Sequence, residues 1–449
     1  MSTLDSSATQ SGTTGKYLVL LPEEDTNEGI NILTQAAGIA SVARAADFAD
    51  GAVKAEQITG KDALVFDHLN VASMSLDPDQ FQSLSSASTD RGPMLIEPER
   101  IVYAQNKIGI NLPEQVMAAP IIATQSSNLS VEYLQGYRDA INNLVDNLLL
   151  SQGAQASGAA VAAATEPEFT WGLKATKVLE SPFTGRGIKV AVLDTGMDLT
   201  HPDFAGRNII SKSFIANEDV QDGQGHGTHC IGTACGPRQP QTLPRYGVAY
   251  DAEIYAGKVL SNKGSGADGG ILAGIEWAIT NDCHIISMSL GAATYPGQPF
   301  SRIFENVAKR ALRQETLIIA AAGNESGRPK LINPVGHPAN CPSIMGVAAI
   351  DSRFQVASFS NRGINPDGGQ VDIAGPGVDV YSTYPMPDKY RRLNGTSMAT
   401  PHVAGIAALY AEATGANGRA LWSLLVQNAY RLELPSADVG VGLTQAPLA

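Results

Sequence analysis

From about residue 166 the chain alternates short apolar runs with segments of helical pattern. Strands that are apolar along their whole length are typical of parallel sheets, because such strands are buried on both faces. We therefore predict an α/β domain over residues 166–449, with a parallel central sheet and helices on both of its faces. The apolar runs that predict the strands are Val190–Leu193, Ile254–Val259, Ile285–Leu290, Leu317–Ala322 and Ile344–Ile350.

Three polar side chains stand where the reactive groups of such a sheet gather, beyond strand ends or at helix starts. Asp194 directly follows the first apolar run. His226 follows a glycine-rich entry, and Ser397 stands at the start of a helical segment. A serine hydroxyl is a weak nucleophile until an imidazole accepts its proton, and a buried carboxylate must hold that imidazole in the right tautomer. The three residues therefore predict a catalytic triad.

The segments that carry these residues resemble the signature motifs of the subtilisin-like serine proteases, which have the same Asp, His, Ser order. The resemblance covers about residues 167–430 and implies a subtilisin-like fold. It also implies a serine endopeptidase that acts on peptide or protein substrates through an acyl-enzyme and requires no cofactor. The matching segments are Asp194–Asp203, Asp222–His229, Lys258–Leu260, Gly264–Gly266, Gly274–Ala278, Ser287–Gly291, Ala321–Glu325, Gly336–Pro338 and Asn394–His402.

The resemblance assigns a role to each catalytic residue. Asp194 would orient His226, and His226 would act first as general base and then as general acid. Ser397 would attack the scissile carbonyl. Asn324 would complete the oxyanion hole beside the backbone N–H of Ser397, where a donor stabilises the negative charge of the transition state.

The same comparison implies how a substrate binds. Two extended segments would flank a peptide as added strands, a form of recognition that reads mainly the main chain. Gly323 and Gly336 would line the primary specificity pocket, with Glu325 at its rim. Asp268 stands where many relatives carry an aromatic residue beside a more distant subsite, so we expect a polar or basic preference there. The residues of the two flanking segments are Gly264, Ser265, Gly266, Ser289, Leu290 and Gly291.

Residues 17–104 read as a small α+β unit with the order β-α-β-α-β and room for one more strand at residues 71–76. This pattern predicts a ferredoxin-like fold. The unit, taken as residues 17–105, resembles the prosegment that precedes subtilisin-like domains. The resemblance implies a zymogen in which the chain's own prosegment inhibits the enzyme by blocking its cleft. The strands are expected at Tyr17–Leu21, Ala63–Phe66 and Pro93–Ile96.

Two segments lie outside these domains. Residues 1–16 are rich in Ser and Thr and are expected to form a flexible tail. Residues 106–165 depart from the family pattern, with an amphipathic helix at Val131–Leu150 and a flexible linker of small residues. The processing site is therefore left open between the neighbourhood of Ala104, the region Ser151–Thr165, or both.

The net charge of the chain disfavours some classes of binding partner. The net charge is −13, which argues against binding to nucleic acid or to an anionic membrane. Residues 1–165 hold 8 Lys and Arg against 19 Asp and Glu, or −11, so residues 166–449 are nearly neutral at −2. The sequence contains no run of 18 apolar residues, which is about the length needed to span a bilayer. We expect a monomer.

The start of the sequence lacks a basic segment followed by an apolar one, which is the pattern of a secretory signal. We therefore expect a cytoplasmic location, with export by a non-classical route as the alternative. The identity of any metal stays unknown. Calcium is possible because Asp203 matches a calcium-binding residue of many relatives, but the loop 236–245 has neither acidic residues nor Asn. Calcium requires six or more oxygen ligands.

Two other functions remain open at this point. One is a peptide transpeptidase or macrocyclase on the same scaffold. The other is a stable, dormant complex in which the prosegment never leaves and the chain acts only by binding. The mass of the product separates hydrolysis from ligation, and labelling of Ser397 with a fluorophosphonate separates an enzyme from a dormant site.

Overall fold

The computed structural model describes most of the chain in one compact unit, made of residues 1–109 and 168–449. The predicted helix at Val131–Leu150, the linker and the possible processing region at Ser151–Thr165 lie outside the described residues. Within this unit, the residues that the structure describes are 12–22, 26–48, 51, 53, 60–89, 92–104 and 168–448.

The parallel sheet has seven strands in the order β16-β15-β14-β12-β8-β10-β9. All of its strand pairs are parallel. This arrangement confirms the predicted α/β fold with a parallel central sheet. The strands are β8 (Lys189–Asp194), β9 (Ile209–Ser213), β10 (Glu253–Lys258), β12 (Ile285–Met288), β14 (Leu317–Ala321), β15 (Met345–Ile350) and β16 (Ile373–Pro376).

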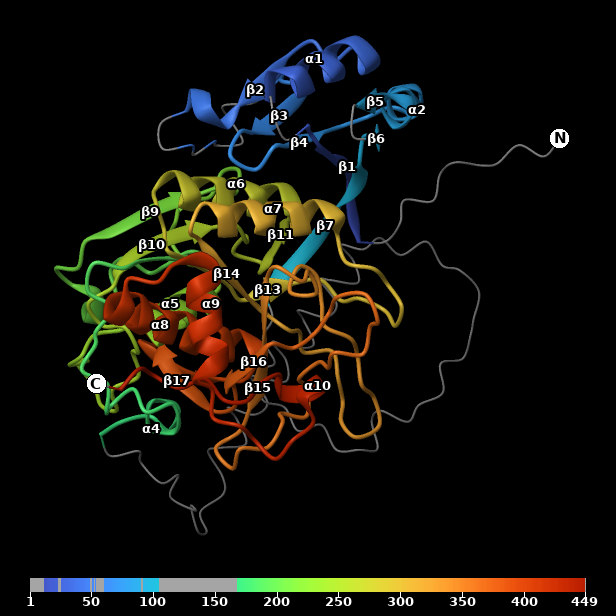
Figure 1. The fold of residues 1–449 in the computed structure, drawn as a ribbon. Helices are drawn as coiled ribbons and strands as arrows, with labels where there is room; N and C mark the ends of the chain where they lie inside the picture. The colour runs from blue at the N-terminus through green and yellow to red at the C-terminus, as the bar shows by residue number, and fades with distance from the viewer. Residues whose placement is uncertain are drawn as a thin grey trace, which may run out of the picture. The chain divides into compact units, whose positions relative to one another are not determined.

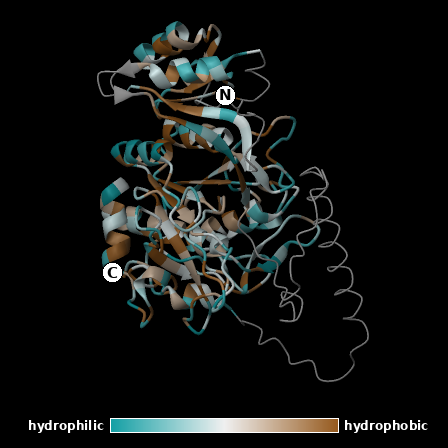
Figure 2. Ribbon diagram, turned by 90° about the vertical axis from the view of Figure 1, so that its right-hand side faces the viewer, coloured by the Kyte–Doolittle hydropathy of each residue, from teal (hydrophilic) through white to brown (hydrophobic). Residues whose placement is uncertain are grey.

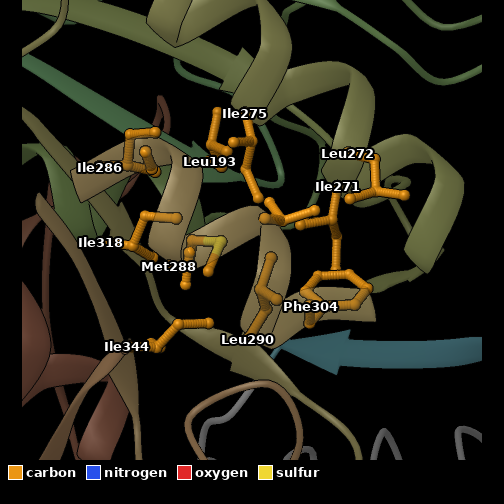
Figure 3. Close-up of a cluster of buried hydrophobic side chains, with 14 of the residues drawn as sticks. Leu193, Ile271, Leu272, Ile275, Ile286, Met288, Leu290, Phe304, Ile318 and Ile344 are labelled. Carbon is orange, nitrogen blue, oxygen red and sulfur yellow. The ribbon is translucent and has the colours of Figure 1, made fainter. Parts of the chain in front are cut away.

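Successive side chains of β8 point to opposite faces of this sheet and pack in two separate cores. Val190 and Val192 belong to the core under helices α5 (His226–Cys235) and α8 (Thr396–Thr414). Leu193 belongs to the core under α6 (Asp268–Thr280) and α7 (Arg302–Arg313). Figure 3 shows Leu193 among the side chains of Ile275, Ile286 and Ile318. The helices therefore cover both faces, with α6 and α7 side by side on one of them (Figure 1).

Two helices start at residues that the sequence analysis selected. Helix α5 begins at His226 and α8 begins at Thr396, one residue before Ser397. Almost the whole of α8 is buried, because it is built from small and apolar residues that pack against both α5 and the sheet. The packing of α8 therefore fixes the position of its N-terminal turn.

The N-terminal strands form a second, mostly antiparallel sheet in the order β7-β1-β4-β3-β2. Two short strands from later in the chain, β11 (Ser265–Ala267) and β13 (Leu290–Gly291), also pair with β7 and bring this sheet to seven strands. The strand predicted near residues 71–76 is present as β4. Helix α2 starts with a capping box, in which the Asp77 carboxylate accepts a hydrogen bond from the Gln80 N–H at 2.8 Å. The elements are β1 (Thr13–Leu20), α1 (Thr26–Ala37), β2 (Val42–Arg44), β3 (Ala63–Phe66), β4 (Val71–Met74), α2 (Pro78–Ser86) and β7 (Ile96–Ala104).

Two boundaries of this unit differ from the prediction. Strand β1 begins at Thr13, so part of the expected tail pairs with β7, through Thr13 and Arg100. The closing strand β7 runs over Ile96–Ala104 rather than ending at Ile96. The sequence of this strand contains a Pro and three charged residues, so it lacks the apolar pattern by which strands are predicted.

The remaining elements are short. In Figure 2, hydrophobic residues gather on the strands inside the fold, and hydrophilic residues are frequent on the outer helices. No helix among the described residues is both long and apolar enough to cross a membrane. The remaining helices and strands are η1 (Ala45–Asp47), β5 (Ser88–Thr89), β6 (Gly92–Pro93), α4 (Trp171–Ala175), η5 (Pro202–Phe204), β11 (Ser265–Ala267), β13 (Leu290–Gly291), β17 (Val380–Thr383), β18 (Tyr390–Leu393), α9 (Gly418–Gln427) and α10 (Ser436–Val439).

Candidate active site

Asp194 and His226 meet at the carboxyl end of β8. The imidazole Nδ1 lies 2.7 Å from the Asp194 Oδ1, and both side chains are buried. The same carboxylate oxygen accepts the backbone N–H of Thr195 at 2.7 Å. A proton on Nδ1 therefore points to the carboxylate, which leaves the lone pair of Nε2 to accept a proton.

The environment of His226 raises the pKa of its imidazole well above the ordinary value of 6.5. Burial acts in the opposite direction, because it disfavours the charged ring. The negative charge of Asp194 and its hydrogen bond favour the charged ring. This is the electrostatic arrangement that a general base needs, since the imidazolium that forms during the reaction is stabilised.

The loop before His226 is organised by Asp222, to which the sequence analysis gave no role. The Asp222 Oδ1 accepts the N–H of Gly225 at 2.7 Å and the hydroxyl of Thr195 at 2.9 Å. Its Oδ2 accepts the N–H of Thr228 at 2.8 Å. Asp222 thus ties the start of α5 to the end of β8. A carboxylate four residues before the histidine, in a glycine-rich segment, was the available signal.

Ser397 lies in the first turn of α8 and is fully buried. Its hydroxyl donates to the carbonyl oxygen of Ser289 at 3.0 Å. The Cys230 Sγ lies 3.6 Å from the Ser397 carbonyl oxygen and 3.9 Å from the His226 Nδ1. The structure therefore brings Ser397 close to the Asp194–His226 pair.

Asn324 follows strand β14 and faces the start of α8. Its side-chain oxygen accepts two hydrogen bonds from Thr396, one from the backbone N–H at 2.9 Å and one from the hydroxyl at 2.9 Å. These two bonds fix the plane of the Asn324 amide next to Ser397. Thr396 was not among the predicted site residues, although it lies beside Ser397 in the motif.

Five of the six predicted residues of the flanking segments lie against residues of β7, and the sixth, Ser289, directly precedes β13. Strand β11 pairs with β7 on one side, and β13 pairs with β7 on the other, both antiparallel. The N–H of Ala104 donates to the carbonyl of Gly264 at 2.9 Å. Ala104 is also opposite Leu290. A segment of the chain itself therefore lies between the two strands.

Gly323 and Gly336 occupy positions without room for a side chain. A Cβ at Gly323, whose φ is +107°, would lie 2.6 Å from a carboxylate oxygen of Glu325. A Cβ at Gly336 would lie 2.8 Å from the carbonyl oxygen of Ala292. The Glu325 carboxylate in turn accepts a hydrogen bond from the Asn361 amide at 2.5 Å. Close packing therefore requires glycine at both positions.

Three buried side chains lie close enough together to be tested as a metal site. Asp194, His226 and Cys230 place one ligand atom each within 4.8 Å of one another. Burial raises the pKa of the Cys230 thiol, so the sulfur stays protonated and is a poor metal ligand. Among the described residues this cluster therefore fits a catalytic pair better than a metal centre.

The residues around Asp203 do not fit calcium. Its carboxylate accepts the N–H of Gln241 at 2.8 Å, the hydroxyl of Tyr246 at 2.5 Å and the hydroxyl of Tyr390 at 3.1 Å. Burial, together with the Asp203 charge, raises the pKa of both tyrosines, so they remain protonated donors. A calcium ion is bound by the lone pairs of oxygen ligands. Around Asp203, N–H and O–H donors instead point their hydrogens at the carboxylate, from the positions that further oxygen ligands of the ion would occupy.

The chain is similar to several proteases. It is 42% identical over 239 residues to subtilisin E of Bacillus subtilis (strain 168), which is 53% of this chain and 58% of that protein. It is 41% identical over 238 residues to subtilisin DY of Bacillus licheniformis, or 53% of this chain and 81% of that protein. An alkaline protease of Alkalihalobacillus alcalophilus is 36% identical over 313 residues, or 69% of this chain and 73% of that protein.

These relatives overturn the predicted cytoplasmic location. They are secreted subtilisins and alkaline proteases, which points to an extracellular location instead. The prediction was wrong because it rested on a missing pattern at the start of the sequence, and such a negative observation does not determine where a protein works.

A family profile agrees with the relatives. The profile of the subtilase family matches residues 185–442, which is more than half of the chain. The matched range contains Asp194, His226, Asn324 and Ser397. The resemblance noted from the motifs is thereby confirmed, and the chain belongs to the subtilase family.

Proposed function

We propose that the chain is a serine endopeptidase, made as a zymogen, that hydrolyses peptide bonds with Asp194, His226 and Ser397 as its triad. The observation that supports this most strongly is the 2.7 Å contact between buried Asp194 and His226, beside Ser397 at the start of α8. Catalysis by a subtilase needs no cofactor, and its substrates are peptides or proteins.

In the first half of the reaction the Ser397 Oγ attacks the carbonyl carbon of the scissile bond. The hydroxyl proton passes to the His226 Nε2, and Asp194 stabilises the imidazolium. The amide of Asn324 and the N–H of Ser397 donate to the oxyanion. When the intermediate collapses, the C–N bond breaks, and the leaving amine takes the proton from His226.

In the second half, water hydrolyses the ester on Ser397. His226 accepts a proton from the water as it attacks, and the C–O bond to Ser397 then breaks. The proton returns to the Ser397 oxygen, so that the enzyme is restored.

The proposal of a zymogen is supported by the place of β7. This strand, Ile96–Ala104, pairs with both β11 and β13, in the manner expected of a bound peptide. Two of its glutamates also cap helices of the larger domain. Glu97 accepts the N–H of Arg302 at 2.8 Å, and Glu99 accepts the N–H of Gly269 at 3.0 Å. Both glutamates accept backbone N–H groups of a first helical turn, which have no partner within the helix, so these contacts hold the strand in the cleft.

We propose further that residues 17–105 act as the inhibitory domain, that residues 166–449 are the mature enzyme, and that the mature enzyme is a monomer. Processing near Ala104, or within Ser151–Thr165, would release it. Because −11 of the charge lies in residues 1–165, maturation should leave a domain of net charge −2 and raise the isoelectric point.

The test is to express the wild type and Ser397→Ala side by side, measure intact masses, and treat both with a fluorophosphonate. We expect the wild type to be cut and labelled, and Ser397→Ala to remain at 47.0 kDa without label. Equal cutting of both proteins would mean that another protease processes the chain. An uncut wild type that is not labelled would support the dormant complex, and a ligated peptide product would support a transpeptidase.

A further inference from the structure

We propose that Asp268 and His337 form an acidic subsite that binds a basic residue of the substrate together with the main-chain N–H of that residue. In this structure Arg100 of β7 occupies the subsite. The inference rests on the proposed function, because it takes β7 as the guide to how a substrate lies in the cleft.

Asp268 binds the main-chain N–H of Arg100 where the strand pairing ends. The ladder between β7 and β11 ends at Ile101 and Ala267. The next residue on the enzyme side is Asp268, which opens helix α6. Its Oδ2 accepts the N–H of Arg100 at 3.0 Å. A carboxylate therefore takes the place that a backbone carbonyl would have if β11 were longer.

The same oxygen also attracts the side chain of that residue. The Arg100 Nη1 lies 3.7 Å from the Asp268 Oδ2 and 3.5 Å from the Glu97 Oε2. The Asp268 side chain is 0% exposed, whereas that of Arg100 is 20% exposed. A buried carboxylate is costly without hydrogen-bond donors and a positive partner. The donor and the positive charge that meet this need on the β7 side come from Arg100.

His337 positions the carboxylate. Its Nε2 lies 3.0 Å from the Asp268 Oδ1, the oxygen that faces away from Arg100. The imidazole packs edge-on against the Phe304 ring at 4.6 Å between centroids. The backbone of His337 is paired with Ala292 in both directions, at 2.9 and 2.8 Å. The His337 ring is therefore held against the Oδ1 of Asp268. The other carboxylate oxygen, Oδ2, is left to accept the N–H of Arg100.

The position and the sequence of a good substrate follow from this geometry. Arg100 lies four residues before Ala104, so a scissile bond after residue 104 or 105 would make it the fifth or sixth residue before the bond. Two residues after Arg100, Val102 is fully buried in the core that contains Leu290. We therefore expect a preference for peptides with a basic residue followed, two positions later, by an apolar one.

The experiment uses internally quenched peptides in which Arg or norleucine is moved through the fourth to eighth positions before the scissile bond. The enzymes are the wild type, Asp268→Asn, His337→Gln and a matched control, Asp282→Asn. Asp282 is 91% exposed, and its positive φ of 53° is one that Asn tolerates. Active sites are counted by fluorophosphonate titration before kcat and KM are measured.

We expect the wild type to cleave the Arg peptide about five- to tenfold better than the norleucine peptide at the fifth or sixth position, through KM rather than kcat. Asp268→Asn should bring this ratio close to one, and Asp282→Asn should leave it unchanged. His337→Gln should lower the ratio partly, again through KM. An equal ratio in the wild type and Asp268→Asn, or no preference at any position, would overturn the proposal.

A second measurement does not depend on activity. In the full chain with Ser397→Ala, the amide of Arg100 should exchange its hydrogen slowly, because it donates to Asp268. Adding Asp268→Asn should speed the exchange of that amide by tenfold or more, and adding Asp282→Asn should not. Unchanged exchange with Asp268→Asn would overturn the contact. Failure of the wild type to react with the fluorophosphonate would instead contradict the proposed function.

Discussion

The hydroxyl of Ser397 donates its hydrogen bond to the carbonyl oxygen of Ser289, at 3.0 Å. Nε2 of His226 has no hydrogen-bond partner among the residues that the structure describes. The nucleophile is therefore turned toward a substrate-binding segment rather than toward its base. Attack on a substrate requires the Ser397 hydroxyl to direct its hydrogen to the His226 Nε2 instead.

The pH dependence of activity should follow His226. Only the neutral imidazole can accept the Ser397 proton, and the environment raises the pKa of this group above 6.5. Activity should therefore be low in acid and rise with pH through the raised pKa, with its midpoint above pH 6.5. The measurement is kcat/KM against pH for a short peptide substrate. A midpoint below 6.5 would contradict the electrostatic role given to Asp194.

The Asp194 carboxylate should be essential for fast catalysis. Asp194→Asn should lower kcat by about 10⁴, because the imidazole loses its correct tautomer and the charge that stabilises its protonated form. Its folded state should be measured by thermal unfolding as the control. A loss of less than tenfold in a folded variant would exclude Asp194 as the residue that orients His226.

The amide of Asn324 should act mainly in the transition state. Asn324→Ala should lower kcat by about 10² to 10³ with little change in KM, the range known for this kind of donor in a subtilisin. Thr396→Val removes one of the two bonds that fix the Asn324 amide, so a smaller loss in kcat is expected. Thr400→Val is a matched control, because the Thr400 hydroxyl bonds within α8, to the carbonyl of Thr396. Equal effects of the two threonine variants would argue against a specific role of the Thr396 hydroxyl.

The hydrogen bonds around Asp203 predict stability that does not depend on calcium. Treatment with a chelator, or addition of millimolar calcium, should therefore shift the Tm of the wild type and of Asp203→Asn by the same amount. Tyr246→Phe removes a buried donor to Asp203 and should destabilise the fold by about 1–3 kcal/mol, lowering Tm by several degrees. A drop in Tm on chelation that is restored by calcium, and that is lost in Asp203→Asn, would show that the Asp203 site binds the ion after all.

The hold of β7 on the cleft should weaken as pH rises. Burial raises the pKa of the Glu99 carboxyl in the closed state, against the opposing effects of the Thr14 hydrogen bond and the Lys16 charge. The nearby charge of Asp268 raises it further. A group with a raised pKa favours the closed state fully below its ordinary pKa, about 4.3, and this contribution is lost as pH rises through the raised value.

This effect can be measured in Ser397→Ala by the hydrogen exchange of β7, corrected for the intrinsic pH dependence of exchange. We expect protection to fall as pH rises above about 4.3, and Glu99→Gln to reduce that dependence. Asp79→Asn, which changes an exposed acidic residue in the first turn of α2, serves as the control. Protection that increases with pH would contradict the assignment to Glu99.

Local patterns predicted much of the fold and the catalytic residues. The run Val190–Leu193 is apolar and is followed directly by Asp194, so both the buried parallel strand and the polar residue at its end could be inferred. The motif around Ser397 likewise predicted a helix start. Strand β7 was placed wrongly, because its partners β11 and β13 lie more than 150 residues further along the chain and its own sequence is not apolar.

The sequence by itself therefore determined the family, the parallel sheet and the candidate triad, because each depends on residues close together in the chain. Only the tertiary structure decided which groups surround a buried charge. Asp203 is bonded by Tyr246 and Tyr390, and Asp268 by Arg100 and His337. No local pattern encodes these contacts, since they form only when folding brings distant segments together and each buried carboxylate has to find donors.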